Sequence, residues 1–342
     1  MNSRRGKADR PAADPFGERR GLRHRAVHRV LGGRFEFLAD EPALLGLADE
    51  AFGGLHTRGD RRSERRFRVV LQASGADASD PGDVPSMRYF AGAGTIGGVI
   101  DAANLALVEC ARAAALVRVG PSLFASRYRA RCELLEFAVY TLAARVLRHA
   151  PLHAACLGLG DRGVLLSGDS GAGKSTITLL GAAAGLAVLS EDSTLVEPRH
   201  LRATGLASYV HVRADTLRFV TDAALRRRIE ASPVITRRSG VVKYEVDLRS
   251  SGLPSAVAPL SMRALVFLSS RAAGRQPLRR LDADAAIARL AREQPYAAAH
   301  DTWPALAARM RRLPAFELRR GADPQATVAV LRGLLEADHR PA

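Results

Sequence analysis

The spacing of apolar and polar residues in the first part of the chain indicates a mixture of strands and helices. Residues 34–39 and 65–73 alternate apolar and polar positions, which is typical of half-buried strands. Residues 41–55 place apolar side chains at helical spacing and end in a glycine pair, which predicts a helix. Residues 97–117 and 126–149 are rich in Ala and Leu, so we expect both to be helices. The first part is therefore expected to have an α+β fold.

After residue 150 the pattern changes to short apolar strands that alternate with helices, as in α/β proteins. The expected strands cover residues 154–159, 164–166, 186–189, 195–196, 208–212, 241–246, 264–268 and 315–318. The expected helices begin at Gly173 and cover residues 215–229, 283–292, 303–312 and 323–336. We predict three parts: a disordered basic tail at 1–25, an α+β region at 26–150 and an α/β domain at 151–338.

The composition of the 342 residues, 47% of them hydrophobic, is that of a soluble globular protein. No apolar run reaches the length of a transmembrane helix, and the basic N-terminus lacks the apolar segment of a secretory signal. Three cysteines, Cys110, Cys132 and Cys156, have neither metal-ligand nor disulfide-framework spacing. We therefore expect a cytoplasmic protein with reduced thiols and no membrane partner.

A formal charge of +16 raises the question of nucleic-acid binding. However, 48 of the 51 basic residues are arginine, which together with abundant Ala is typical of a GC-rich coding sequence. The chain has no stacking motif of aromatic and basic residues, no zinc finger and no helix-turn-helix pattern. We expect a solvated basic surface rather than a nucleic-acid site. Lys174 and Lys243 stand out because arginine is used at almost every other basic position.

A glycine-rich segment carries the most specific chemistry in the chain. Residues 168–175 match G-x-x-x-x-G-K-[ST] after a buried strand and before an amphipathic helix. In such a loop the backbone N–H groups hold phosphate oxygens, the lysine contacts the β- and γ-phosphates and the hydroxyl binds Mg²⁺. The sequence therefore predicts a site for ATP and Mg²⁺. Its residues are Gly168, Asp169, Ser170, Gly171, Ala172, Gly173, Lys174, Ser175 and Thr176.

A pair of acids, Glu191 and Asp192, follows the next apolar strand. A carboxylate at the end of a neighbouring strand can hold Mg²⁺, orient water or accept the proton of a hydroxyl. A solvated pair of acids at a strand end is the alternative interpretation.

The loop alone does not name a reaction, because many folds contain it. The chain has no signature of a transporter ATPase, no guanine-reading motif and no recognisable helicase or recombinase motifs. Residues 152–192, however, resemble the HPr kinase/phosphorylase superfamily and its divergent HPr-kinase-related members. The shared order is a strand bearing a histidine, a second strand, G-D-S-G-x-G-K-S, a helix and paired acids. His153 lies fifteen residues before Gly168, as in the family.

The resemblance implies an α/β fold, the P-loop nucleotide-binding domain of the HPr kinase and phosphoenolpyruvate carboxykinase type, over 151–338. It implies ATP-dependent phosphorylation of a serine hydroxyl. In these terms Lys174 and Ser175 supply charge and a metal ligand, and Asp192, with Glu191 beside it, holds Mg²⁺ and acts as general base. His153 would lie beside the reacting phosphates; a buried structural histidine is the alternative. Lys243 is a further candidate for contacting phosphate or acceptor, or an ordinary strand lysine.

Two departures from the family pattern concern the acceptor. Glutamate replaces the first aspartate of the pair, and only a faint match follows where the family has a second glycine-rich signature. Both argue against HPr itself as the acceptor and against the reverse phosphorylase reaction. We therefore expect a kinase that transfers the γ-phosphoryl group of ATP to a hydroxyl, in particular serine, of a peptide, protein or small molecule. The alternatives are an ATP-binding switch or scaffold without catalysis and, last, a nucleic-acid-dependent ATPase. Relatives with the implied fold often form ring-like oligomers, so a homo-oligomer is allowed.

Overall fold

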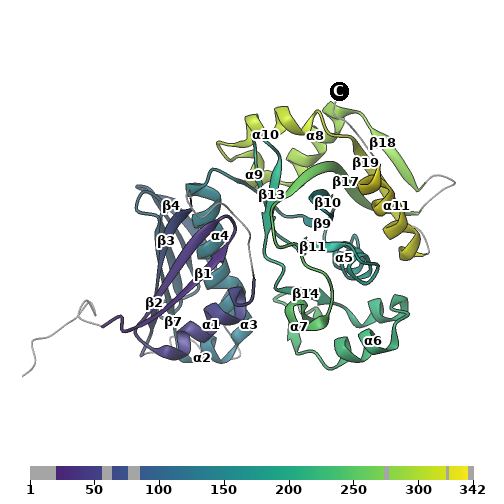
Figure 1. Cartoon of the computed structure of the whole chain (residues 1–342). Helices are drawn as coiled ribbons and strands as arrows, with labels where there is room; N and C mark the ends of the chain where they lie inside the picture. Colours follow the sequence, from purple (N-terminus) through teal and green to yellow (C-terminus); the bar gives the residue numbers. More distant parts are fainter. Residues whose placement is uncertain (1–20, 56–63, 76–84, 273–276, 321–322, 338–342) are drawn as a thin grey trace, which may run out of the picture.

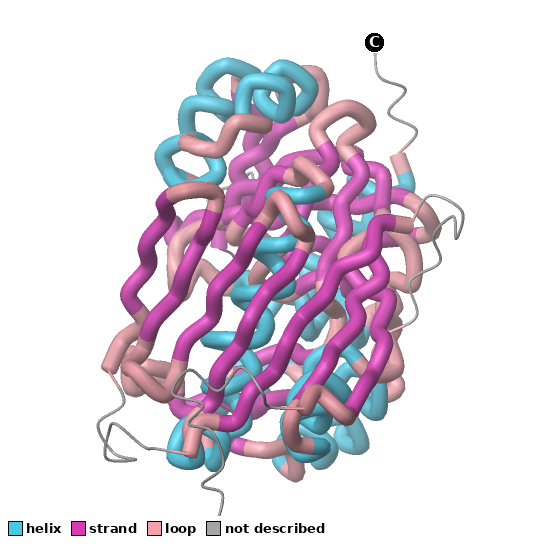
Figure 2. Tube along the Cα trace, turned by 90° about the vertical axis from the view of Figure 1, so that its left-hand side faces the viewer, coloured by secondary structure: helices cyan, strands magenta, loops and turns pink. Residues whose placement is uncertain are grey.

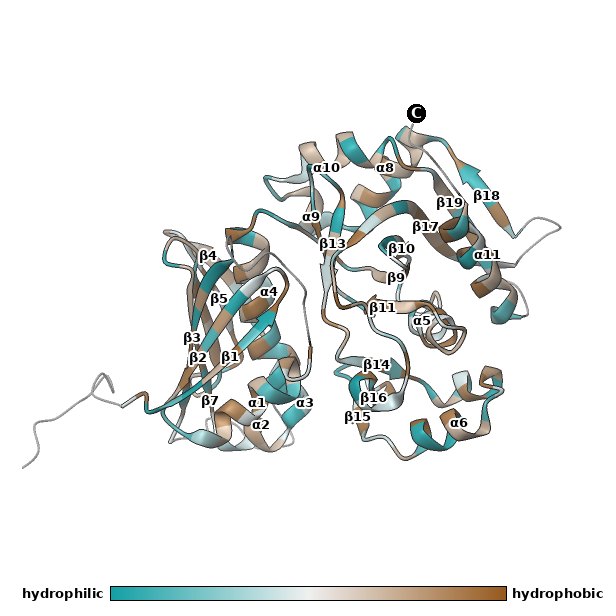
Figure 3. Cartoon of the chain, in the orientation of Figure 1, coloured by the Kyte–Doolittle hydropathy of each residue, from teal (hydrophilic) through white to brown (hydrophobic). Residues whose placement is uncertain are grey.

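The computed structural model describes residues 21–55, 64–75, 85–272, 277–320 and 323–337. The chain is a mixed α/β protein built around two large sheets that use different parts of the sequence (Figure 1). One sheet contains residues from the first 120 positions and the other contains residues from position 150 onward. Figure 3 shows apolar residues in brown along the strands and helices of both parts.

The first sheet has seven strands in the order β1-β2-β3-β7-β6-β5-β4. The strands are β1 (His24–Val30), β2 (Gly33–Ala39), β3 (Arg65–Ala73), β4 (Arg88–Gly92), β5 (Thr95–Val99), β6 (Leu105–Glu109) and β7 (Ala114–Val119). Helices α1 (Pro42–Phe52) and α4 (Glu136–Val146) pack on one face of this sheet, and Figure 2 shows the strands in front of them. The strand predictions at 34–39 and 65–73 and the helix at 41–55 are confirmed.

The helix predicted at 97–117 is wrong, because this segment forms β5, β6 and β7. The Ala and Leu content favoured a helix, but the burial of β6 and β7 alternates residue by residue, as it does in a strand with one covered face. The turn between β5 and β6 is held by Asp101, whose carboxylate accepts hydrogen bonds from the N–H groups of Ala103 and Asn104. Strand pairing therefore outweighed the helix propensity of the segment.

The helical prediction at 126–149 is confirmed over most of its length. The segment contains α3 (Arg127–Arg129), a π-helix η1 (Ala130–Leu135) and α4, and it follows the short α2 (Pro121–Ala125). The predicted tail at 1–25 is wrong at its end, because β1 begins at His24. The rest of that tail, residues 1–20, lies outside the described residues.

The second sheet has nine strands, with the path β11-β9-β10-β17-β13-β12-β8 and with β19 and β18 beside β17. The strands are β8 (Ala150–Leu152), β9 (Ala155–Leu159), β10 (Arg162–Ser167), β11 (Ala187–Ser190), β12 (Thr194–Glu197), β13 (Arg202–Gly205), β17 (Leu260–Ala272), β18 (Leu278–Leu281) and β19 (Ala315–Arg320). Strand β17 is parallel to both β10 and β19. This sheet confirms the predicted strands at 154–159, 164–166, 186–189, 195–196, 264–268 and 315–318.

Helices cover both faces of the second sheet. On one face α5 (Lys174–Ala183) and α11 (Pro324–Glu336) pack against Val164 and Leu166 of β10. On the other face α8 (Ala283–Glu293) and α10 (Trp303–Met310) pack around Leu165 of the same strand. A strand buried on both faces has a continuous apolar sequence, which is why residues 164–166 were readily predicted.

A third, small sheet has the order β14-β16-β15, with β14 (Tyr209–Val212), β15 (Val234–Thr236) and β16 (Val242–Asp247). The helix predicted at 215–229 is divided into a 3₁₀-helix η2 (Ala214–Phe219) and α6 (Ala223–Glu230). Asp222 separates them because its carboxylate accepts hydrogen bonds from the N–H groups of Ala224 and Leu225, as an N-cap does. The remaining short helices are α7 (Leu248–Ser251) and α9 (Pro295–Ala298).

Two further sequence predictions concern membrane-spanning helices and the state of the cysteines. None of the helices in the described part of the chain is both long enough and apolar enough to span a membrane. Cys110, Cys132 and Cys156 are free thiols in the structure.

Candidate functional site

The predicted phosphate loop joins the end of β10 to the N-terminus of α5. Gly171 and Gly173 have φ angles of 84° and 102°, which side chains other than glycine rarely adopt. The Lys174 ammonium donates a hydrogen bond to the carbonyl oxygen of Gly168 at 2.6 Å. No side chain of the described residues caps α5, so the N–H groups of its first turn are available to an anion.

Glu191, directly after β11, contacts this loop. The Ser175 hydroxyl donates a hydrogen bond to the Glu191 carboxylate, which is 6% exposed. Burial raises the pKa of Glu191, but hydrogen bonds from His211 and Ser175 and the charges of His211 and Lys243 outweigh it, so the pKa lies below its usual value. Glu191 is therefore an ionised carboxylate next to the hydroxyl of the loop.

Asp192 points to a different partner. Its carboxylate lies 3.2 Å from Nδ1 of His153, and both side chains are about half exposed. The two residues meet because β8, which ends just before His153, pairs with β12, which begins just after Asp192. Gln294 holds the backbone of His153 from both sides: its side chain accepts from the His153 N–H at 2.8 Å and donates to the His153 carbonyl at 2.9 Å. In the structure His153 lies in the bend between β8 and β9 and not inside a strand.

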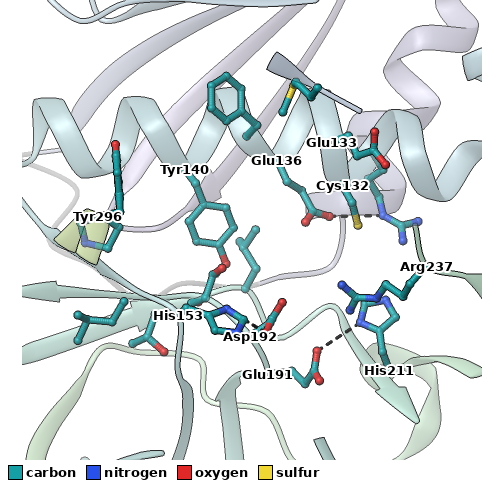
Figure 4. A pocket seen from close by; sticks show the side chains of 18 of the residues that line it. Cys132, Glu133, Glu136, Tyr140, His153, Glu191, Asp192, His211, Arg237 and Tyr296 are labelled. Atoms are coloured by element: carbon teal, nitrogen blue, oxygen red, sulfur yellow. Dashed lines mark hydrogen bonds and ion pairs between the residues drawn. The ribbon is translucent and has the colours of Figure 1, made fainter. Parts of the chain in front are cut away.

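His153, Asp192 and Glu191 line a cavity of about 770 Å³ between the two sheets. Figure 4 shows these three residues and His211 on one wall, with Tyr140, Glu136 and Cys132 projecting from the α4 side. The volume is within the range typical of small-ligand sites. The two acids that adjoin in sequence thus line one cavity but contact different partners: Glu191 contacts Ser175 of the loop, and Asp192 contacts His153.

Several residues at this site carry no signal in the sequence. His211 of β14 joins two carboxylates, with Nδ1 3.3 Å from Glu191 and Nε2 3.1 Å from Glu245. Burial lowers the pKa of His211, but these two hydrogen bonds outweigh it and raise the pKa above its usual value. Only the pairing of β14 with β16, opposite His211 and Glu245, brings these side chains together.

The charges of Glu191 and Asp192 act on two nearby cations, Lys243 and Arg237. Burial lowers the pKa of Lys243, the charge of Glu191 opposes this shift and Arg237 adds to it. Burial also acts to lower the pKa of Arg237, but Tyr128, Asp192 and Glu191 raise it. The Arg237 Nε has no hydrogen-bond partner among the described residues. Lys243 and Arg237 are thus cations near the acids, and the sequence had indicated the first of them.

A smaller hollow, of about 220 Å³, adjoins the loop. It is lined by Gly173, Thr176 and Ile177, and by Phe219 at the end of η2. The Arg218 guanidinium lies over the Phe219 ring at 4.6 Å from its centroid. An aromatic ring beside a glycine-rich loop suits the flat base of a nucleotide whose phosphates lie on the loop.

Glu245 gives the site a testable effect on stability. Burial raises the pKa of Glu245, but the hydrogen bond from His211 and the charge of Arg131 outweigh it and lower the pKa. A carboxylate with a lowered pKa stabilises the fold above its unfolded-state pKa of about 4.3, and this contribution is lost as pH falls through the folded-state value. Glu245→Gln should therefore cost roughly 1.5 to 3 kcal/mol of unfolding free energy at neutral pH. The difference in unfolding free energy between the wild-type protein and Glu245→Gln should become smaller as the pH falls through the acid range. Urea unfolding of both proteins across pH measures it, and a pH-independent gap would contradict the assignment.

Comparisons with known proteins leave the family open. No family model matches the chain, and no curated protein matches it. Among solved structures, the HPr(Ser) kinase/phosphatase from Coxiella burnetii is similar over 54% of this chain and 94% of that chain, with 13% sequence identity and a TM-score of 0.27.

Proposed function

We propose that this protein is a kinase that uses ATP and Mg²⁺ to phosphorylate a hydroxyl, in particular serine, of a peptide, protein or small-molecule acceptor. One observation carries the proposal. Adjacent carboxylates that line one cavity contact different partners: Glu191 contacts Ser175 of the glycine-rich loop, and Asp192 contacts His153. A phosphoryl-transfer site needs such a division, because one carboxylate serves the nucleotide and the other serves the acceptor.

On the nucleotide side, residues 168–176 would hold the phosphates through backbone N–H groups and the Lys174 ammonium. The hydroxyl of Ser175 and the carboxylate of Glu191 are hard oxygen donors in contact with each other, and this donor set fits Mg²⁺ together with substrate phosphates. When bound, Mg²⁺ supplies neutralisation of the negative charge on the β- and γ-phosphates. We propose Glu191, rather than Asp192, as the carboxylate on the metal side.

On the acceptor side, the hydroxyl would enter the cavity and lose its proton to Asp192. The acceptor oxygen forms a bond to the γ-phosphorus while the bond from that phosphorus to the β–γ bridging oxygen breaks, and ADP leaves. His153, 3.2 Å from Asp192 and held by Gln294, orients the accepting carboxylate. Lys243 and Arg237 add positive charge near the transferred group.

We also propose that the chain divides near residue 150, with residues 151–338 forming the P-loop domain of the HPr kinase and phosphoenolpyruvate carboxykinase type. The proposal rests on the strand–loop–helix order of β10, the loop and α5. A cytoplasmic location and a serine hydroxyl as the acceptor group are proposals of the same kind.

The deciding experiment follows phosphate labelled at the γ-position of ATP, with Mg²⁺, into the components of a host-like extract. A peptide, protein or metabolite that is labelled by the wild-type protein but not by Lys174→Ala would establish the kinase and identify its acceptor. ATP binding without any labelled product would instead favour the ATP-binding switch.

The hollow beside Phe219 provides a separate prediction for the nucleotide. Phe219→Ala should raise the KM for ATP roughly 10-fold with little change in kcat, because base stacking on an aromatic ring is worth about 1 to 3 kcal/mol. Phe219→Tyr keeps the ring and should keep the wild-type KM. Steady-state kinetics of the three proteins test this, and an unchanged KM in Phe219→Ala would place the base elsewhere.

A further inference from the structure

A buried arginine from the first part of the chain reaches the proposed nucleotide site. Arg131 is 2% exposed and lies in the π-helix η1, between α3 and α4. Its guanidinium forms an ion pair with Glu245 of β16, which is 7% exposed. The pair therefore crosses from the helices of the first sheet to the small sheet beside the phosphate loop.

From Arg131 a continuous series of polar contacts leads to the loop. Glu245 contacts Nε2 of His211 at 3.1 Å, and Nδ1 of His211 contacts Glu191 at 3.3 Å. Glu191 in turn accepts the hydrogen bond from Ser175. Glu191 and His211 are 6% and 8% exposed, so water cannot readily replace the protein partners along this route.

The surroundings of Arg131 hold its guanidinium in place. Glu136 lies 3.5 Å and Glu50 3.9 Å from its nitrogens, and the ring of Tyr209 lies 4.2 Å from its central carbon. Single π-helical turns inside longer helices frequently occur at functional positions. A planar guanidinium can pair with one carboxylate, approach others and stack on a ring at once, which an ammonium cannot do.

We infer that Arg131 is a positioning residue for the carboxylate of Glu191, acting through Glu245 and His211. This inference rests on the proposed function, in which Glu191 serves the metal side of the nucleotide site. Arg131 fixes Glu245, Glu245 fixes the imidazole of His211, and the imidazole fixes one oxygen of Glu191 so that the other meets Ser175. The nucleotide site is therefore complete only with the first sheet and its helices docked, although its loop lies wholly in the second part.

The test measures Mg²⁺ dependence rather than catalysis. Wild-type protein and Arg131→Gln are titrated by calorimetry with a non-hydrolysable ATP analogue at a series of Mg²⁺ concentrations. Loss of a residue that orients a metal ligand typically costs about 10- to 100-fold in metal affinity, and Arg131→Gln should shift the Mg²⁺ requirement by this factor. Arg131→Lys keeps the positive charge but lacks the planar guanidinium with its several N–H donors, so it should recover little of the lost Mg²⁺ affinity.

A matched control lies on the same helix. Glu133 of η1 also forms an ion pair with a residue of the second part of the chain, accepting from Nε of Arg238 at 2.8 Å. Within the described part of the chain it forms no hydrogen bond or ion pair with Glu245, His211 or Glu191. Glu133→Gln should leave the Mg²⁺ requirement unchanged. Should Arg131→Gln not fold, Glu245→Gln is titrated instead and should give the same shift, since it interrupts the same route.

The outcomes separate this inference from the proposed function. Wild-type protein that binds no Mg²⁺-nucleotide would overturn the proposed function, and the inference with it. Wild-type binding with an unaltered Mg²⁺ requirement in Arg131→Gln would overturn the inference alone. An equal shift of the Mg²⁺ requirement in Glu133→Gln would also overturn the inference. It would show that loss of any ion pair between the first and second parts of the chain changes the Mg²⁺ requirement.

Discussion

Replacing Lys174 with alanine is expected to lower phosphoryl transfer by about 100- to 1000-fold or more, the effect of removing a donor aimed at developing charge. Lys174 is 8% exposed and its ammonium already lies at the loop, against the carbonyl of Gly168. It is also one of only three lysines in a chain that otherwise uses arginine. A compact ammonium fits among phosphate oxygens where a guanidinium does not, so Lys174→Arg should not restore activity.

The fold should survive the Lys174 substitution. Among the described residues its ammonium makes one hydrogen bond, to a loop carbonyl, and no ion pair. Circular dichroism and thermal unfolding check the fold, and transfer from γ-labelled ATP checks the activity. Full activity in folded Lys174→Ala protein would reject the assignment of the loop.

The second large effect distinguishes the two neighbouring acids. Asp192→Asn should lower kcat by about 100- to 10,000-fold, the usual contribution of a general base, and should leave the binding of Mg²⁺-nucleotide intact. Glu191→Gln should instead weaken that binding, because Glu191 contacts Ser175 whereas Asp192 faces His153 across the cavity wall. Both substitutions are isosteric, so packing changes little.

Two measurements on the same proteins decide this prediction. Calorimetric titration with Mg²⁺ and a non-hydrolysable ATP analogue reports the nucleotide side, and single-turnover transfer from labelled ATP reports the chemical step. Wild-type transfer by Asp192→Asn would remove it as the base. Loss of nucleotide binding in Asp192→Asn, with normal binding in Glu191→Gln, would show that the two roles are reversed.

Where local pattern and tertiary environment agree, the sequence predicted the fold well. The strand at 164–166 is apolar throughout because helices cover both of its faces. The segment 97–117 shows the opposite case. Its Ala and Leu residues favour a helix locally, but three neighbouring strand pairings give them a place in the seven-stranded sheet. These hairpins are fixed in the sheet by the parallel pairing of β7 with β3, which joins Ala114 to Arg68, and helix propensity does not register such a distant pairing.

The candidate site shows the same division. The glycine-rich loop is a local structure, since its turn, its lysine and the start of its helix are consecutive in the chain, and the motif alone predicts a phosphate site. The acids after β11 were also visible as a pair. Their different partners were not, because the contact of Asp192 with His153 depends on the pairing of β8 with β12.

The sequence by itself determined the loop of 168–176, the paired acids, His153 as a candidate and the alternation of strands and helices after residue 150. Only the tertiary structure decided that Glu191 belongs with Ser175, and that His211, Glu245 and Arg131 extend from it into the first part of the chain. The physical reason is burial. Ionic groups withdrawn from water require partners, and those partners come from whichever strands and helices the fold brings near, however far apart in sequence.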